Sequence, residues 1–314
     1  MNKKVVVLGG GTGMSCLIRG LKKFPLDITT VVSVCDDGRS TGRLRNEFNI
    51  PAVGDIRQIL VSLSETEPLV EKLLNYRFNT TSDLNGHTVG NLLLTASSNI
   101  TGNMSDGIET LGHVLNLKGR VLPLTEDNVT LMAKMQDGSI IEGEHSITEY
   151  NGKIEQVYYK EEPIINEAVL NAIKEADLII LSMGSLYTSI IPNLICKDII
   201  NEIDKSKAKI VYTCNIMTQP GETDDYKVSD HIKTLNKYLG KRKIDVVIAN
   251  NGKIDRKLAR KYSNLEQKDP VVLDVKETKE ENVKIISENL VIIENNLLRH
   301  DILKLGFHIF SLVL

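Results

Sequence analysis

The chain has 314 residues, of which 41% are hydrophobic and 25% charged, as is typical of a globular protein with a sizeable core. Its 38 basic and 41 acidic residues give a formal net charge of −3, so no global field attracts nucleic acid or an anionic membrane. Aromatic residues make up only 4%, which disfavours binding of single-stranded nucleic acid on stacked aromatic platforms.

The N-terminal segment and the cysteines predict a cytoplasmic protein. The apolar run Val5–Leu8 is shorter than the roughly 7–15 residues of a secretory signal core. No stretch approaches the roughly 18 apolar residues of a membrane span, so we expect no membrane insertion. The cysteines form no CxxC pair, which predicts reduced thiols rather than a disulfide or a zinc site. They are Cys16, Cys35, Cys196 and Cys214.

The chain opens in the way that a parallel α/β sheet does. A buried strand at Lys4–Leu8 leads through a glycine run into a helix with an apolar face, and a second strand follows at Ile28–Val34. Polar residues then predict a loop that runs to about Pro51. Apolar residues recur at helical spacing from residue 55 to residue 116, which predicts a mostly helical region.

A change of pattern near Gly119 predicts a small insertion. The residues alternate as far as about Lys160, with hairpin signals at Asp137-Gly138 and Asn151-Gly152. We therefore predict an antiparallel β-hairpin insertion at residues 118–160, which is too small to fold alone. Further strands follow it. They are predicted at Leu178–Leu181, Ile210–Thr213, Val246–Ala249, Val271–Val275 and within Val283–Ile293.

The tail completes the predicted architecture. Ile302, Leu305, Ile309 and Leu312 recur at helical spacing and predict a final helix that docks on the sheet. The fold class is α/β, with a Rossmann-like, mostly parallel sheet flanked by helices. We expect one such domain over residues 1–314, interrupted by the insertion at residues 118–160.

The glycine run between the first strand and the first helix predicts a phosphate-binding turn. Gly10, Gly11, Thr12 and Gly13 let the backbone approach a phosphate, and the helix N-terminus offers free N–H groups. The run is not a P-loop, since no Lys follows it, and it matches GxGxxG imperfectly. A tight strand–helix turn without a ligand is the alternative.

Two adjacent carboxylates, Asp36 and Asp37, come at the end of the second predicted strand. An acid about 20 residues after a glycine turn binds ribose hydroxyls in dinucleotide-binding proteins, and paired carboxylates can hold Mg²⁺. The segment DDGRSTGRLR adds arginines and hydroxyls that suit phosphate, and a solvated Asp-Asp turn is the alternative. The candidates in this segment are Arg39, Ser40, Thr41, Arg43 and Arg45.

Two further candidate groups open predicted helices. Asp55 suits either a helix N-cap or a ligand contact. His87 is either a structural imidazole or, together with Asn91, part of the site.

The loops after two later strands and one residue near the C-terminus complete the candidates. The hydroxyl-rich loop after Leu181 lacks the GxSxG spacing of a nucleophile elbow, which favours hydrogen bonds to phosphate. The loop after Thr213 carries amides that suit sugar or base edges, and a long turn around Pro220-Gly221 is the alternative. These candidates are Gly184, Ser185, Thr188, Asn215, Thr218, Gln219 and Arg299.

These motifs together carry a family resemblance. GGGTG, DDGRSTGRLR, GDIR, GHTVGN, GSLYTSIIPN, CNIMTQPGET and RHD occur in this order over nearly the whole chain. The ordered set resembles the gluconeogenesis factor (YvcK-like) family, within the superfamily of 2-phospho-L-lactate transferase (CofD-like). Two positions depart from the family pattern. Ser182-Met183 precede Gly184-Ser185 where Gly-Pro-Gly-Ser is usual, and Arg39 stands where DDGGS is commoner.

The resemblance implies a Rossmann-like core, a cytoplasmic location and a role in cell-shape and cell-wall homeostasis during gluconeogenic growth. Proteins of this branch look like binders of UDP-sugars such as UDP-N-acetylglucosamine, with no established turnover. In the transferase branch the acidic DDG region holds Mg²⁺, a role that would fall to Asp36 and Asp37. Gly9–Gly13 match the nucleotide-facing turn, and Arg299 of RHD matches a position expected to contact the UDP-sugar.

Three functions are therefore weighed. The first is a UDP-sugar-binding regulatory protein without turnover, and the second is an Mg²⁺-dependent transferase of the 2-phospho-L-lactate transferase type. The third is an NAD-dependent oxidoreductase, which the glycine turn followed by an acid suggests. The few aromatic residues argue against a flat deazaflavin acceptor. The expected partner is a UDP-sugar or another nucleotide, with no nucleic acid, and homo-oligomerisation is left open.

Overall fold

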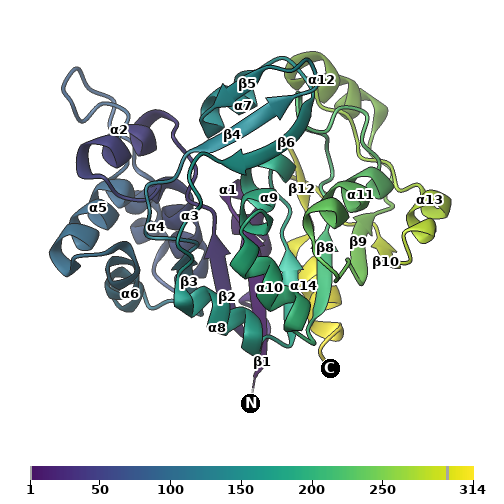
Figure 1. The fold of residues 1–314 in the computed structure, drawn as a ribbon, viewed down its shortest axis with the longest axis horizontal. Helices are drawn as coiled ribbons and strands as arrows, with labels where there is room; N and C mark the ends of the chain where they lie inside the picture. The colour runs from purple at the N-terminus through teal and green to yellow at the C-terminus, as the bar shows by residue number, and fades with distance from the viewer. Residues whose placement is uncertain (1, 295–296) are drawn as a thin grey trace.

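A parallel seven-stranded sheet forms the centre of the molecule (Figure 1). The computed structural model describes residues 2–294 and 297–314, and the order of the large sheet is β10-β9-β8-β7-β1-β2-β3. This confirms the predicted α/β class. The strands are β1 (Lys3–Gly9), β2 (Leu26–Val32), β3 (Arg120–Pro123), β7 (Leu178–Leu181), β8 (Lys209–Thr213), β9 (Val246–Asn250) and β10 (Lys284–Glu288).

The core lies on both faces of β1 and β7. Val5, Leu8 and the whole of β7 are fully buried, as expected for strands that helices cover on both sides. Figure 1 shows α1, α3 and α14 behind the sheet, and α8, α10 and α11 in front of it. These helices are α1 (Gly11–Leu21), α3 (Val53–Leu63), α8 (Glu167–Glu175), α10 (Lys197–Lys205), α11 (Val228–Tyr238) and α14 (Ile302–Ser311), the last of which confirms the predicted tail helix.

The polar loop predicted to run to Pro51 is wrong, because residues 39–48 form a helix. The buried side chains of this helix, α2 (Arg39–Phe48), include Ser40, Leu44 and Arg45. Of these only Leu44 is apolar, so the periodicity of hydrophobic residues could not reveal the helix. The Arg45 guanidinium donates to the carbonyl oxygens of Cys35 and Asp36, each at 2.9 Å, which fastens α2 to the segment that follows β2.

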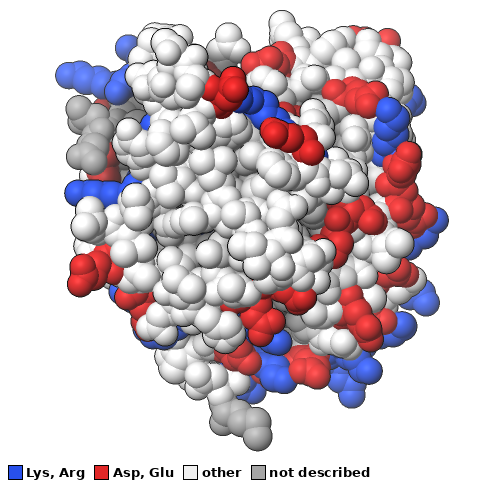
Figure 2. Space-filling view, turned by 90° about the vertical axis from the view of Figure 1, so that its left-hand side faces the viewer, with Lys and Arg blue, Asp and Glu red and all other residues white. Residues whose placement is uncertain are grey.

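Helices α4 (Pro68–Asn75), α5 (Val89–Thr101) and α6 (Met104–Val114) complete the predicted helical region between β2 and β3. Figure 2, which faces this side of the molecule, shows a broad area without charged side chains. Leu69 and Leu73 of α4 and Leu93 and Ile100 of α5 are among the exposed apolar residues. Exposed apolar residues often mark interaction sites when they are contiguous, and whether the chain forms homo-oligomers stays open.

The antiparallel insertion lies over the carboxyl ends of the large sheet (Figure 1). Its three strands have the order β5-β4-β6, and α7 (Glu144–Glu149) connects β5 to β6. The strands are β4 (Leu131–Met135), β5 (Ile140–Glu142) and β6 (Ile154–Tyr159). β3 lies within the range 118–160 but pairs in parallel with β2, so the antiparallel sheet starts later than the predicted insertion.

A second prediction that is wrong concerns the C-terminal part of the chain. No strand forms at Val271–Val275; the segment is irregular up to α13 (Val275–Glu280). Pro270 has no N–H to donate, and it forms only an isolated bridge with Met217. The next two residues each make a single backbone bond, from the Val271 amide to the Ile216 carbonyl (2.9 Å) and from the Val228 amide to the Val272 carbonyl (3.1 Å).

The other predicted strands are confirmed, with boundaries shifted by at most two residues. Val283–Ile293 contains β10 and most of β11 (Val291–Glu294), which pairs with β12 (Leu297–His300) in a separate antiparallel ribbon. Helix α12 (Arg256–Glu266) precedes them. In the described ranges, no helix combines the length and the apolar character needed to cross a membrane.

Candidate functional site

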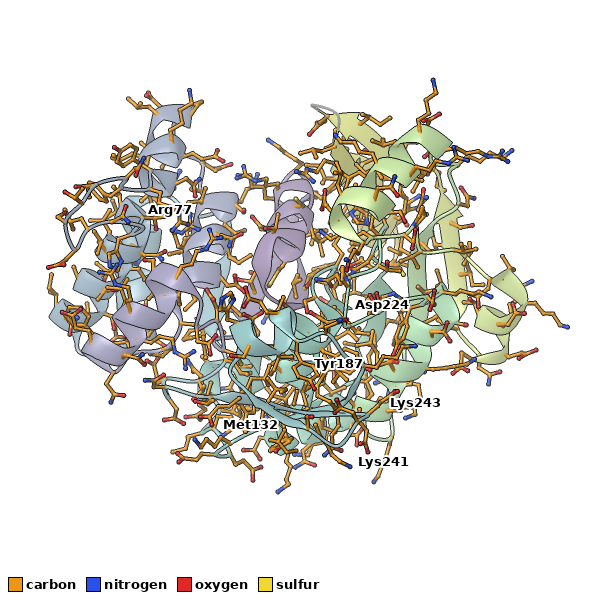
Figure 3. The ribbon with its side chains drawn as sticks, turned by 90° about the horizontal axis from the view of Figure 1, so that it is seen from above. Arg77, Met132, Tyr187, Asp224, Lys241 and Lys243 are labelled. Atoms are coloured by element: carbon orange, nitrogen blue, oxygen red, sulfur yellow. The ribbon has the colours of Figure 1, made fainter. Side chains whose placement is uncertain are left out.

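The strand order places the candidate site between β1 and β7. The chain continues from β1 to β2 on one side, whereas β7 to β10 follow one another on the other side. Open α/β sheets bind ligands at the carboxyl ends of the strands beside such a reversal. Figure 3 looks onto this edge from above, and Tyr187, which follows β7, lies between the N-terminal elements on the left and the C-terminal elements on the right.

Two adjoining cavities of about 250 and 470 Å³ form one cleft at this edge. They share Gly11, Ser185, Ser189 and Gln219. A larger cavity of about 570 Å³ lies between α6, β3 and the start of α8, but none of the candidate residues lines it. The cleft is therefore the candidate site.

The glycine turn after β1 lets α1 approach the segment that follows β7. Gly11 has a left-handed φ of +64°, which favours glycine. A Cβ on Gly13 would lie 1.3 Å from the Met183 carbonyl oxygen, so backbone packing requires glycine there. Gly11, Thr12 and Gly13 line the larger cavity, while Gly10 faces the Asp55 carboxylate, which its Cβ would meet at 2.5 Å.

Asp55 does not cap its own helix, as the sequence allowed, but reaches the first turn of α1. Its Oδ2 accepts the Gly11 N–H at 2.7 Å, and the residue at the N-cap of α3 is Ala52. Burial and the neighbouring Asp36 raise the pKa of Asp55 to about 7. A carboxylate of this chain thus occupies the anion-binding end of α1.

The smaller cavity, which we call the acidic half of the cleft, collects carboxylates. Asp36, Asp55, Glu144 and Glu222 line it, together with the hydroxyls of Ser33, Thr148, Ser185, Thr188 and Ser189. Burial, followed by the charge of Asp36, raises the pKa of Glu144 to about 7. Burial also raises the pKa of Glu222, which accepts the Ser185 hydroxyl (2.5 Å) and the Tyr187 N–H (3.1 Å). Among the described residues, no Lys, Arg or His lines this half.

The larger cavity, which we call the basic half, has the opposite character. Lys268 and Arg299 line it together with the N-terminal turn of α1, and none of its described lining residues is acidic. Lys268 also pairs with Glu266 at 2.9 Å, whereas Arg299 has no ion pair in the described ranges. Burial lowers the pKa of His300 in the same wall to about 4, so this imidazole is neutral at pH 7.

Two amides in the cleft have oxygen atoms without a protein partner. Asn215 Oδ1 and Gln219 Oε1 are buried and accept no hydrogen bond in the described part of the chain. The Asn215 amide nitrogen is fixed, since it donates to the Gly184 carbonyl at 2.8 Å. Buried polar atoms are nearly always paired, so these two oxygens are suited to accept from a ligand.

The structure brings most of the remaining loop candidates into the cleft. Ser185 accepts the Thr188 N–H (3.0 Å) and hydroxyl (2.6 Å) at the start of the π-helical turn η1 (Leu186–Ile190). Thr218 does not line the cleft; it is buried and bonds the backbone of Asp269.

Asp37, Arg39 and Arg43 are not in the cleft. Asp37 Oδ1 accepts the His145 N–H of α7 at 2.9 Å, and Arg43 donates to the Asp83 (2.6 Å) and Asn85 (3.0 Å) carbonyls. All three line a neighbouring cavity instead. Asp36 and Asp37 point apart because successive side chains alternate along an irregular, extended segment.

Ser40, His87 and Asn91 form a buried cluster between α2 and α5 rather than lining the cleft. The Ser40 hydroxyl lies 2.8 Å from His87 Nδ1 and accepts from the Asn91 amide at 3.3 Å. Burial, and then the charge of Arg43, lowers the pKa of His87. The cluster therefore connects α2 to the start of α5.

Sequence reasoning missed Glu144, Thr148, Ser189, Glu222 and Lys268. Glu144 and Thr148 lie in the insertion, far from any glycine-rich motif, and Lys268 follows α12 in an irregular segment. Glu222 stands within CNIMTQPGET, and a carboxylate in a loop after a strand of the sheet was a signal that could have marked it.

The acidic half fits Mg²⁺ in its donor chemistry. Asp36 and Asp55 supply carboxylate oxygens, and Mg²⁺ commonly binds one or two carboxylates together with substrate phosphates. Within residues 2–294 and 297–314, no group of three or more His, Cys, Asp or Glu side chains is arranged to hold a metal ion. A bound Mg²⁺ would therefore need ligands from a bound nucleotide.

We expect Asp55→Asn to stabilise the protein at pH 8. Asp55 has a pKa of about 7 in the folded state instead of the usual 3.8. Below pH 4 this carboxyl is protonated in both the folded and the unfolded chain, and above pH 7 it is ionised in both. The free energy of unfolding therefore falls as the pH rises between these values, because the folded chain must then bury a charge. Solvent screening limits the gain to on the order of 1–2 kcal/mol.

Urea unfolding in EDTA checks this expectation. The free energy of unfolding of Asp55→Asn should exceed that of the wild type at pH 8, and by less at pH 5. Asp83→Asn, which changes an exposed carboxylate in the loop before α5, is the control. An equal difference in unfolding free energy between variant and wild type at pH 8 and pH 5 would contradict the raised pKa of Asp55.

Comparisons with known proteins agree with this architecture. The family model for 2-phospho-L-lactate transferase CofD matches residues 5–291. The gluconeogenesis factor of Bacillus subtilis is 47% identical over 300 residues, covering 95% of this chain and 94% of that protein. The gluconeogenesis factor of Halalkalibacterium halodurans is 44% identical, with 97% and 94% covered. A crystal structure of a UPF0052 family member from Bacillus halodurans superposes with a TM-score of 0.95 at 42% identity and covers 98% of this chain and 99% of that one.

An open parallel sheet with a cleft at the reversal of its strand order is the architecture of a Rossmann-like α/β protein. The chain belongs to the CofD family. Within that family it is similar to the proteins named gluconeogenesis factor, and the expected family is thereby confirmed.

Proposed function

We propose that the cleft binds a UDP-sugar of the UDP-N-acetylglucosamine type. The protein would act as a regulatory binding protein in cell-shape and cell-wall homeostasis during gluconeogenic growth. The observation that carries the binding proposal is the separation of charge in the cleft, since Lys268 and Arg299 line one half and four carboxylates line the other. The name gluconeogenesis factor, which relatives at 40–47% identity carry, supports a role in gluconeogenic growth, and the cell-shape role rests on the family resemblance alone.

A nucleotide sugar has the charge pattern that this cleft requires. Its diphosphate is anionic and suits the basic half, where an Arg guanidinium can bind phosphate in a bidentate manner. The oxygens of Asn215 and Gln219 suit the N–H groups of the uracil or the sugar. The neutral, hydroxyl-rich sugar suits the acidic half, where carboxylates accept hydrogen bonds from hydroxyls.

The position of Asp55 argues against the oxidoreductase hypothesis. In a dinucleotide-binding fold the pyrophosphate lies at the N-terminus of the first helix. Here the Asp55 carboxylate accepts the Gly11 N–H at that position. Because Asp55 takes that position, we assign the diphosphate of the proposed ligand to the basic half, beside Arg299.

Group transfer is the second candidate, and the family match together with the Asp36–Asp55 pair favours it. Mg²⁺ held by these two carboxylates would neutralise phosphate charge. Asp36 and Asp55 would then position the metal, while Arg299 would hold the phosphates. Product formed from a UDP-sugar only with Mg²⁺, and lost in Asp36→Asn while binding is retained, would favour this function over binding alone.

Isothermal titration calorimetry on the purified chain tests the proposal. We expect saturable binding of UDP-N-acetylglucosamine at close to one ligand per chain, no heat with NAD(H), and no product by chromatography. Titrations with and without Mg²⁺ show whether the metal contributes. Absence of heat with every UDP-sugar tested would contradict the proposal.

A further inference from the structure

Helix α7 holds one face of the insertion against the acidic half of the cleft. Gly143 precedes the helix with φ of +91° and faces the Asp37 carboxylate, which accepts the His145 N–H at 2.9 Å. On the inner side of α7, Ile147 is buried in the core. These contacts fix the first turn of α7, so Glu144 is carried to the cleft by a defined helix rather than by a free loop.

The lining of the acidic half limits what this cavity can accept. Four carboxylates repel a phosphate or another anion, and the many hydroxyls offer little to an apolar group. A volume of about 250 Å³ lies below the roughly 300–1,000 Å³ of cavities for drug-sized ligands. A single neutral ring with several hydroxyl or amide N–H donors fits these limits.

The partners of the four carboxylates single out Glu144. Asp55 accepts the Gly11 N–H (2.7 Å), Asp36 the Gly38 N–H (3.0 Å) and Glu222 the Tyr187 N–H (3.1 Å). The Glu144 carboxylate instead faces hydroxyls: it accepts from the Thr148 hydroxyl at 3.3 Å, one turn along the same helix, and the Thr188 hydroxyl lies beside it and lowers its pKa. A hydroxyl can rotate away and give up this bond to a ligand, whereas the backbone N–H groups are fixed.

We infer that Glu144, together with Thr148, recognises the hydroxyl and amide N–H groups of the sugar, and that this pair distinguishes a UDP-sugar from UDP. The inference rests on the proposed function, because it assigns the sugar of the proposed ligand to the acidic half. Glu144 is a specificity-determining residue in this account, since it contacts neither the diphosphate nor the uracil.

Calorimetry of Glu144→Gln with UDP and with UDP-N-acetylglucosamine tests the inference. A hydrogen bond to a charged group contributes about 1.5–3 kcal/mol, so at pH 8, where Glu144 is mostly ionised, we expect the variant to bind the UDP-sugar about 10- to 100-fold more weakly. Its affinity for UDP should be unchanged or slightly higher, because one negative charge is removed from the cleft. Thr148→Val should weaken only UDP-sugar binding, by a smaller factor.

Glu149→Gln is the matched control, because Glu149 is exposed on the same helix and faces His145 at 3.5 Å. It should leave both affinities unchanged, and circular dichroism should show all variants folded. Equal loss of both ligands in Glu144→Gln, or no loss of either, overturns the inference. The inference is also overturned if Glu144→Gln removes an Mg²⁺ dependence of UDP binding while the UDP-sugar still binds more tightly than UDP by the wild-type factor. Wild-type protein that binds neither ligand overturns the proposed function and the inference with it.

Discussion

An Arg299→Ala variant is expected to bind UDP-N-acetylglucosamine about 10- to 100-fold more weakly than the wild type. Arg299 lines the basic half and has no ion pair within the described ranges, so its charge is available to a diphosphate. Lys268 forms an ion pair with Glu266 at 2.9 Å and is expected to contribute less to the affinity for the diphosphate. Titration calorimetry at fixed ionic strength measures the effect, since salt screens such contacts.

Arg256→Ala is the control for charge. Arg256 is exposed at the start of α12 and lines neither half of the cleft, so its removal should leave the affinity unchanged. UDP should lose affinity in Arg299→Ala as strongly as the UDP-sugar does, because the guanidinium acts on the diphosphate. Loss of the UDP-sugar alone would show that Arg299 lies beside the sugar and would refute the assignment of the basic half.

A Gly13→Ala variant is expected to lose more than about 4 kcal/mol of stability or to fail to fold. Its Cβ would lie 1.3 Å from the Met183 carbonyl oxygen and 2.4 Å from the carbonyl carbon. Because both atoms belong to the backbone, no side-chain rotation relieves the overlap, and α1 must move away from the segment after β7. Urea unfolding followed by circular dichroism measures the loss.

Gly38→Ala is the matched control. Gly38 has an ordinary φ of −76°, and an added Cβ would meet only the Asp36 carboxylate at 3.4 Å, an ordinary contact. We expect its stability to stay within about 1 kcal/mol of the wild type. Near-wild-type stability of Gly13→Ala would show that the close approach of α1 to Met183 is absent in solution.

The parallel sheet could be predicted because its strands are short apolar runs between turns. Val5–Leu8 and Leu178–Leu181 are buried on both faces, and such strands are visible without knowledge of their neighbours. Helix α2 could not be predicted, since Ser40 and Arg45 take buried positions that apolar residues would normally fill. Their burial depends on partners far along the chain, such as His87 for Ser40 (2.8 Å).

Sequence reasoning predicted those cleft residues that lie in the segments directly after strands of the large sheet, as with Gly13, Ser185 and Gln219. It missed those in a distant segment that is folded over the cleft, as with Glu144 on α7. Conversely, Asp37 is adjacent to Asp36 in sequence but binds the backbone of α7. Sequence adjacency therefore predicted Asp36 and Asp37 as a pair, whereas in the fold Asp36 lines the same cavity as Asp55.

A crystal structure of the protein with UDP-N-acetylglucosamine tests the division of the cleft most directly. We predict that the diphosphate lies beside Arg299 in the basic half, and that the sugar lies in the acidic half within hydrogen-bonding distance of Glu144. A diphosphate at the N-terminus of α1 in place of Asp55, or a sugar outside the acidic half, would contradict the account.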